Sequence, residues 1–190
     1  KPVIFFTTSA EAMETSFVLS NFFTLFNETF LSPETKHKVK LVSVCTPNDT
    51  HAEIAIAALK LGKSVWCEKP MSSNLPDSKK MLSASKKSKG KTIIGYNYTK
   101  NPAVLHAREL IESGLIGNVA GFFCRYDVDN EADKKRPWSW RMSRKASGTG
   151  ANGDILSHVI SVAHFLVGST ISKVVGDINI VHLKRKDPTN

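Results

Sequence analysis

The segment at residues 41–70, LVSVCTPNDTHAEIAIAALKLGKSVWCEKP, constrains the fold more than any other part of the chain. It opens with an apolar run rich in β-branched side chains, 41–45. Residues 50–61 then carry apolar side chains at helical spacing before Gly62, and a second apolar run follows at 65–67. Strand, helix and strand in this order predict a right-handed crossover and a parallel pair of strands. Because ligands of open parallel sheets bind outside the carboxyl ends of the strands, the polar residues after both strands should line one crevice.

The rest of the chain predicts an α/β protein with few long irregular stretches. Apolar runs predict further strands at residues 3–6, 92–95, 119–126 and 174–182. Helical spacing and capping residues predict helices at residues 9–20, 77–89, 101–113 and 154–167. We expect a domain boundary near residues 97–101, which divides the chain into residues 1–98 and 99–190.

Several motifs in fixed order resemble the glucose–fructose oxidoreductase / inositol 2-dehydrogenase family. They are Thr46-Pro47-Asn48-x-x-His51, Glu68-Lys69-Pro70, Gly95-Tyr96-Asn97, Asn101-Pro102, Trp140-Arg141, and the stretch from Gly148 through Asp154 to His158. The resemblance covers roughly residues 40–170. It implies an N-terminal Rossmann domain, here residues 1–98, and the start of an α+β domain with a mostly antiparallel sheet, residues 99–190.

The resemblance also implies an activity. Family members move a hydride between NAD or NADP and a sugar, polyol or inositol, and the matching catalytic residues are Lys69, Asp154 and His158. A rival interpretation is a catalytically inactive, truncated relative that acts as a binding or scaffold module. The family further implies a small-molecule substrate, a cytoplasmic location and a possible homo-oligomer formed through the C-terminal sheet.

One expected motif is missing. A dinucleotide-binding sheet normally opens with a strand and a Gly-x-Gly-x-x-Gly turn, whose backbone meets the pyrophosphate. No such turn precedes residue 40. We therefore expect residues 3–20 to match the family's second strand and following helix, with the first strand and the glycine turn missing. Neither an acidic residue nor Arg ends that strand, at Phe6-Thr7-Thr8, so the choice between NAD and NADP stays open.

The residues themselves are suited to hydride chemistry. His158 is a candidate general base because imidazole titrates near neutral pH. Asp154 lies four residues earlier, so on a helix it would face the same way and could orient the imidazole. Lys69 brings a positive charge that could stabilise a developing alkoxide. Taken singly, His158 could be a core histidine and Asp154 a helix N-cap; their order with Lys69 favours a site.

A second set of residues is expected to contact the cofactor. Its members are Thr46, Pro47, Asn48, His51, Glu68, Lys69, Pro70, Asn97, Trp140 and Arg141. Each has a simpler alternative. Residues 46–51 could serve only as turn and helix cap, Pro70 could be an ordinary loop proline instead of a cis proline, Asn97 could be a polar residue at a strand end, and the Trp140–Arg141 pair could be loop packing.

The charge distribution and the cysteines bear on three other kinds of function: nucleic-acid binding, metal binding and a place in the membrane. The net charge of +9 arises largely from the lysines at positions 79, 80, 86, 87, 89 and 91. A solvated helix face explains them better than a polyanion site, because no nucleic-acid motif accompanies them. We therefore expect no specific nucleic acid partner. The three cysteines are widely spaced and lie in apolar runs, at Cys45, Cys67 and Cys124. This pattern is typical of buried thiols and not of a metal site. No apolar stretch is long enough to span a membrane.

Overall fold

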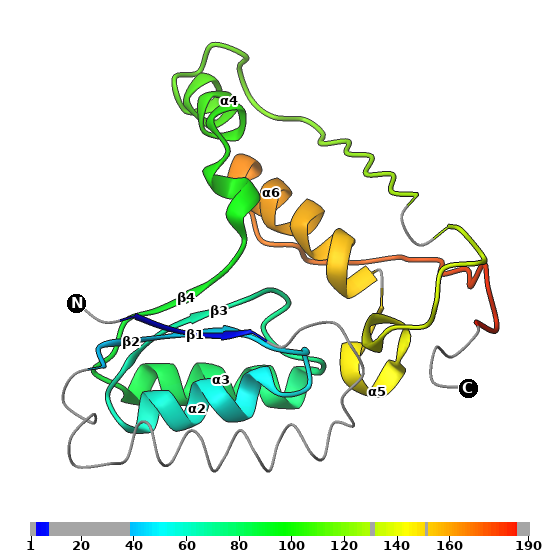
Figure 1. The fold of residues 1–190 in the computed structure, drawn as a ribbon. Coiled ribbons are helices and arrows are strands. Elements are labelled where there is room, and N and C mark those ends of the chain that lie inside the picture. The colour runs from blue at the N-terminus through cyan, green and yellow to red at the C-terminus, as the bar shows by residue number, and fades with distance from the viewer. Residues whose placement is uncertain (1–2, 8–38, 130–131, 151, 186–190) are drawn as a thin grey trace. The chain divides into compact units, whose positions relative to one another are not determined.

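The computed structural model describes residues 3–7, 39–129, 132–150 and 152–185, drawn in colour in Figure 1. The chain forms two compact units. The first contains Lys1–Gly95 together with Ser139–Gly150, and the second contains Tyr96–Trp138 together with Ala151–Asn190. The division after Gly95 lies close to the expected boundary. The expected division placed Ser139–Gly150 in the second part of the chain, whereas in the structure this segment belongs to the first unit.

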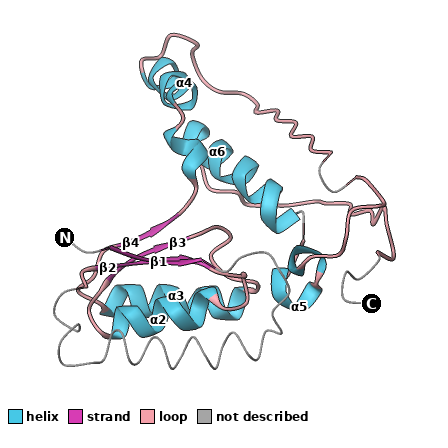
Figure 2. Ribbon diagram, viewed as in Figure 1, coloured by secondary structure: helices cyan, strands magenta, loops and turns pink. Residues whose placement is uncertain are grey.

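A parallel sheet organises the first unit. Its strands are β1 (Val3–Thr7), β2 (Leu41–Cys45), β3 (Ser64–Cys67) and β4 (Thr92–Ile94), hydrogen-bonded in the order β1-β2-β3-β4. Val42 lies opposite Val65 in the register of β2 and β3. The helices α2 (His51–Lys60) and α3 (Leu75–Lys87) run along one face of this sheet (Figures 1 and 2). The predicted crossover and parallel pair are confirmed.

The pairing of β1 differs from the sequence-based expectation. β1 pairs directly with β2, with Val3 opposite Leu41 and Thr7 opposite Cys45. The doubly wound fold has the strand order 3-2-1-4-5-6. Four neighbouring strands that follow one another in sequence order, as β1 to β4 do, match its strands 1, 4, 5 and 6. By its pairing, β1 therefore occupies the place of the first strand, not of the second strand as we expected. The helix expected at residues 9–20 lies outside the described residues.

Apolar residues of β2, β3 and α2 form the core between sheet and helices. Val42, Val44, Ala55 and Ala58 are completely buried. Small alanines on α2 let the helix approach the sheet closely, and β-branched residues pack well on a pleated surface. Gly62 ends the turn after α2 at φ 70°, a conformation that glycine adopts without steric cost.

The strand β3 is buried on one face only. Val65 and Cys67 are buried, whereas Trp66 is 40% exposed. Successive side chains of a strand point to opposite faces. In the described part of the unit, the helices α2 and α3 cover only the face that carries Val65 and Cys67, which accounts for the exposure of Trp66.

Capping residues explain where two helices begin. The Asn74 side chain accepts a hydrogen bond from the Asp77 amide at the start of α3. The Asn101 side chain likewise accepts from the Ala103 amide at the start of α4 (Pro102–Glu112), where Pro102 takes the first helical position. The predicted α4 is confirmed.

The second unit is helical where it has regular structure. A 3-10 helix, Asn97–Lys100, precedes α4, and a π-helical turn, Asn152–Leu156, leads into α6 (Ser157–Val167). Gly168 ends α6 at φ 73°, in the left-handed region. The predicted helix over residues 154–167 is confirmed, except that its first turn is π-helical.

The strands expected at residues 119–126 and 174–182 are wrong. Neither run has strand structure, and Phe123 and Val175 are 91% and 100% exposed. A strand requires backbone pairing with a neighbour, and no described segment pairs with either run. Cys124 is consequently exposed, although its apolar surroundings had suggested a buried thiol. The mostly antiparallel sheet is therefore not found among the described residues.

The helices of the described residues bear on whether this part of the chain could span a membrane. None of its helices is long and apolar enough to cross a membrane.

The thiol of Cys67 is buried in the core of the first unit. Burial, and next the nearby Glu68 carboxylate and Cys45, raises the pKa of the Cys67 thiol to about 12, so this thiol stays protonated and unreactive near neutral pH.

Candidate active site

The loop after β2 is held in shape by its own hydroxyl and carbonyl groups. The Thr50 hydroxyl lies 2.6 Å from the Thr46 hydroxyl and 2.8 Å from the Pro47 carbonyl oxygen. Thr46, Asn48 and Thr50 are all buried. Most buried polar groups of this kind are hydrogen-bonded. The sequence therefore builds a rigid polar turn at the carboxyl end of β2, where ligands of parallel sheets bind.

The returning segment Ser139–Gly150 packs against this turn. The Asn48 side-chain amide donates to the Ser147 carbonyl at 3.0 Å, and the Asp49 backbone amide donates to the Ala146 carbonyl at 3.1 Å. The segment contains the 3-10 helix Trp140–Met142 and the short helix α5 (Arg144–Ser147). Residues about one hundred positions apart in the sequence thus complete one loop cluster.

The loop after β3 carries Glu68, Lys69 and Pro70, all half-buried. The Glu68 backbone amide donates to the Val44 carbonyl at 2.9 Å, which continues the pairing of β3 with β2 by one residue. The peptide bond between Lys69 and Pro70 is cis, as the family resemblance implied. Lys69 therefore leaves the sheet at the same edge as the loop after β2.

His51 joins these two loops. Its side chain is 1% exposed. The ring Nδ1 lies 2.9 Å from the Pro70 carbonyl oxygen, and Nε2 lies 2.8 Å from the Thr46 carbonyl oxygen. Both ring nitrogens are thus engaged with backbone oxygens of the loops, and the ring sits in the first turn of α2.

Burial sets the protonation of the two ionisable groups in this cluster. Desolvation lowers the pKa of His51, although the Pro70 and Thr46 carbonyls and the carboxylates of Glu68 and Asp49 oppose this shift. Desolvation raises the pKa of Asp49, against its own backbone hydrogen bond and the charges of Lys145 and His51. The cluster therefore favours a neutral His51 near pH 7.

The lowered pKa predicts that acid weakens the fold through His51. The unfolded chain binds the His51 proton near pH 6.5, and the folded chain binds it only at lower pH. Stability is therefore complete above pH 6.5 and is lost as pH falls toward the folded pKa, by about 1.4 kcal/mol for each unit between the two values. Urea unfolding of the chain and of His51→Gln at several pH values will measure this. The prediction would be contradicted if the difference in the free energy of unfolding between the wild type and His51→Gln stays constant below pH 6.5.

In the second unit, aromatic side chains surround His158. The His158 ring is 5% exposed and lies parallel to the Tyr98 ring at 4.0 Å between centroids. Tyr96 meets it edge-on at 6.2 Å. The Tyr98 and Tyr126 hydroxyls are 2.7 Å apart, which gives the stacked ring a second attachment. The imidazole is therefore fixed in orientation by packing.

Asp154 lies in the π-helical turn directly before α6 and is half-buried. Single π-turns within helices are frequent at functional sites. The α-helix itself begins after Leu156, so Asp154 is not its N-cap, which removes the simpler explanation for this residue.

Sequence reasoning missed the two tyrosines. Burial raises the pKa of the Tyr96 hydroxyl, against a hydrogen bond with the Ser157 side chain, so Tyr96 stays a neutral phenol beside His158. The sequence signal for these two residues is the pattern Tyr-Asn-Tyr at residues 96–98. Asn97 itself is exposed and begins the 3-10 helix of the second unit.

The predicted site residues fall into two groups. The first unit brings together the loop after β2, the loop of Lys69 and the segment of Trp140 and Arg141, whose guanidinium stacks over the Trp140 ring at 4.7 Å. The second unit contains Asn97, Asp154 and His158. The convergence of Lys69 with Asp154 and His158 stays a prediction.

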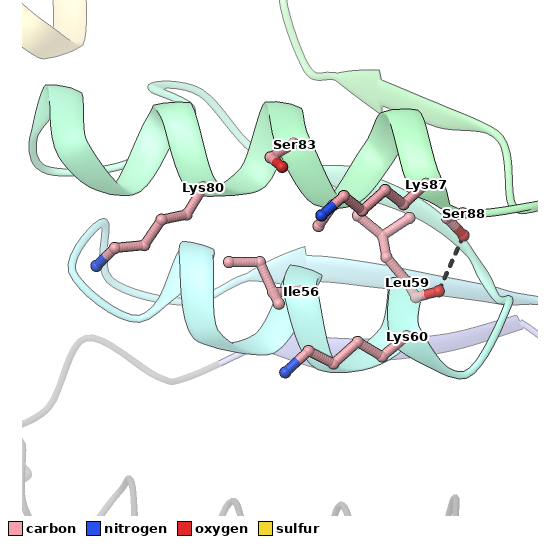
Figure 3. A pocket seen from close by; sticks show the side chains of 8 residues that line it. Ile56, Leu59, Lys60, Lys80, Ser83, Lys87 and Ser88 are labelled. Carbon is pink, nitrogen blue, oxygen red and sulfur yellow. Dashed lines mark hydrogen bonds between the residues drawn. The ribbon is translucent and has the colours of Figure 1, made fainter.

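A shallow pocket of about 440 Å³ lies elsewhere, between the later halves of α2 and α3. Figure 3 shows its apolar floor of Ile56 and Leu59, rimmed by Lys60, Lys80 and Lys87. Both helices end where the next strand begins, so the pocket lies toward the edge of the sheet opposite the candidate site. Lys60 and Lys87 occupy last helical turns, where cations are favoured by the helix dipole. The lysines of α3 are exposed, in agreement with a solvated helix face.

Two family models match most of the chain. Residues 6–96 match the oxidoreductase family with the NAD-binding Rossmann fold, and residues 104–189 match the GFO/IDH/MocA C-terminal domain. The chain belongs to this oxidoreductase family, as its motifs had indicated.

The relatives that this chain matches include a sugar dehydrogenase and an inositol dehydrogenase. Levoglucosan dehydrogenase of Pseudarthrobacter phenanthrenivorans is 43% identical over 130 residues, which cover 68% of this chain and 33% of that protein. Myo-inositol 2-dehydrogenase of Thermotoga maritima is 30% identical over 145 residues, 75% of this chain and 40% of that protein. The chain thus spans a third to two fifths of the length of these relatives.

Solved structures agree with this assignment. Levoglucosan dehydrogenase in complex with NADH and levoglucosan has a TM-score of 0.71 and 34% identity, over 87% of this chain and 45% of that one. An oxidoreductase domain protein from Kribbella flavida has a TM-score of 0.78 and 32% identity, over 98% of this chain and 50% of that one. The Rossmann-like fold is therefore shared with enzymes solved with NADH.

The described loops fit one half of a dinucleotide. The buried turn after β2 follows the strand that borders β1, and in the doubly wound order this is the switch point beside which dinucleotides bind. Polar side chains and a lysine at this edge suit a nicotinamide and its ribose. The pyrophosphate normally requires a glycine turn after the first strand. Residues 8–38, which follow β1, lie outside the described part, and the sequence contains no glycine before Gly62.

Proposed function

We propose that the intact protein is an NAD(P)-dependent oxidoreductase that transfers a hydride between the nicotinamide cofactor and a hydroxyl-bearing carbon of a sugar, polyol or inositol. The observation that carries the proposal is the cluster at the carboxyl edge of the sheet. There the loop after β2 and the loop bearing Lys69 are bridged by the buried ring of His51. Membership of the oxidoreductase family supports the same activity.

The reaction divides between the residues as follows. A bound oxidised nicotinamide would supply the acceptor for the hydride that leaves the substrate carbon. The hydroxyl proton passes to the imidazole of His158, and the carbonyl compound forms as the oxygen keeps its electron pair. The ammonium of Lys69 stabilises the negative charge that develops on that oxygen. Asp154 orients the imidazole or the substrate.

The second unit supports the role of His158. A general base must be held in a fixed direction to remove a proton efficiently. The 4.0 Å stacking on Tyr98 and the edge-on contact with Tyr96 supply that restraint. The inactive binding module is not favoured, because the named relatives are dehydrogenases.

The proposal predicts turnover and cofactor binding that can be measured separately. The intact protein is incubated with NAD⁺ or NADP⁺ and a panel of anhydrosugars, aldoses, polyols and inositols, and NAD(P)H formation is followed by absorbance. Cofactor binding is measured by calorimetry. We expect reduction of the cofactor with at least one sugar or polyol. Cofactor binding without turnover on any member of the panel would indicate a binding module instead.

A further inference from the structure

We propose that His51 is a positioning residue, which bridges the carbonyls of Thr46 and Pro70 and thereby fixes the backbone that presents Lys69. The sequence had suggested that His51 contacts the cofactor. Its two ring nitrogens instead face backbone oxygens, and its side chain is 1% exposed. The inference rests on the proposed function only in assigning a catalytic purpose to Lys69.

The two loops need a donor from elsewhere. Thr46 and Lys69 are each followed by a proline, and proline has no backbone N–H. Each loop therefore contains one peptide nitrogen, that of Pro47 or Pro70, which cannot donate a hydrogen bond. A buried carbonyl without a partner is costly. From the first turn of α2, the His51 ring places one nitrogen within hydrogen-bond distance of a carbonyl oxygen in each loop.

The position of the bridge makes it suited to control Lys69. The Pro70 carbonyl belongs to the residue next to Lys69, and it lies 2.9 Å from Nδ1 of His51. The Thr46 carbonyl begins the turn whose Asn48 side chain holds Ser147. One ring thus connects the lysine loop with the turn and, through that turn, with the returning segment.

The protonation of the ring determines how many bonds it donates. A neutral imidazole carries one N–H and can donate to one of the two carbonyls, whereas an imidazolium donates to both. The carboxylates of Glu68 and Asp49 favour the charged ring. The charge of Lys145 lowers the pKa of Asp49, against the effect of burial, and so favours the carboxylate that attracts a charged ring. Acidification should therefore change the hydrogen bonding of Thr46 and Pro70 together.

Two amide substitutions separate the two halves of the bridge. In His51→Asn the amide nitrogen lies near the position of Nδ1 and can still donate to Pro70. In His51→Gln it lies near the position of Nε2 and can still donate to Thr46. Amide hydrogen exchange followed by NMR reports on each variant at Lys69 and Met71, with Val42 and Val65 of the core as internal references.

We expect His51→Gln to accelerate exchange at Lys69 and Met71 by at least about tenfold, with the core amides unchanged, because the Pro70 contact alone is lost. His51→Asn should keep these two amides protected. In the intact enzyme His51→Gln should lower kcat by on the order of 10- to 100-fold with little change in KM for the cofactor, and His51→Asn should restore most of it.

Equal exchange at Lys69 and Met71 in both variants, or a uniform loss of protection that includes the core, would overturn the proposal. Where a variant does not fold, the wild-type protein decides. The carbonyl carbon resonances of Thr46 and Pro70 must then titrate with the His51 ring nitrogens, and independent titration would refute the bridge. Neither NMR result depends on activity, so a bridged protein without turnover would refute the proposed function alone.

Discussion

Replacing Lys69 by alanine in the intact protein will lower the rate of sugar or polyol oxidation by on the order of 10²–10³-fold. The reason is electrostatic. The lysine is half-buried at the carboxyl edge of the sheet, where a positive charge stabilises an alkoxide more strongly than it would in water. The affinity for NAD⁺ should stay roughly the same, because the proposed role of the ammonium is to stabilise charge on the substrate oxygen during the reaction. Steady-state kinetics and calorimetry on the same preparation will test both expectations.

The matched control is Lys79→Ala, which removes an exposed lysine of α3 and should leave turnover unchanged. His158→Ala should cause a loss similar to that of Lys69→Ala. The double variant should lose far less than the product of the two single effects, because both residues serve one step. Turnover near the wild-type value in Lys69→Ala, or strictly multiplicative losses, would contradict the shared site.

Replacing Gly148 by alanine will destabilise the first unit by about 2–5 kcal/mol. Gly148 has φ 79°, and a Cβ there would lie 2.2 Å from the Ser73 carbonyl oxygen. The obstacle is backbone, so it cannot turn aside as a side chain would. The returning segment and the loop that continues from Pro70 would have to separate. Urea unfolding monitored by tryptophan fluorescence will give the loss.

Gly150→Ala is the matched control for this effect. Gly150 also has positive φ, 57°, but a Cβ there would meet no atom within 4 Å. Its substitution should cost only the left-handed backbone strain, about 1–2 kcal/mol. The difference between the two variants therefore isolates the close approach of the two loops. Equal losses would mean that the segment does not pack against Ser73 as described.

The sequence was sufficient for those parts of the fold that depend on local patterns. The crossover from β2 through α2 to β3 follows from apolar spacing and Gly62. The start of α4 follows from Asn101 and Pro102, both of which act as expected. The location of Lys69 at the carboxyl edge follows from the same reasoning, because parallel strands place their ends together.

Features that depend on distant partners could not be predicted in this way. The runs at 119–126 and 174–182 have strand-like composition, but composition does not supply a neighbour to pair with. The exposure of Trp66 depends on which face the helices cover. The two close contacts of the His51 ring nitrogens join residues 46 and 70 through a third element, and no spacing rule reports such contacts.

The candidate site was accessible only in part. The motifs identified Lys69, Asp154 and His158 through a family resemblance. They did not indicate Tyr98, whose ring stacks on His158, because this contact arises from the packing of the 3-10 helix Asn97–Lys100 against α6. The pairing of β1 was also misjudged, since the missing glycines suggested a missing strand although the strand itself is present.

The return of Ser139–Gly150 to the first unit has a consequence for how the protein is made. The Asn48 amide and the Asp49 backbone amide have their acceptors at Ser147 and Ala146, which a ribosome adds about one hundred residues later. The polar turn after β2 therefore lacks these two acceptors while α4 of the second unit is synthesised. Chain elongation past residue 150 is the event that closes the nucleotide-binding half of the protein.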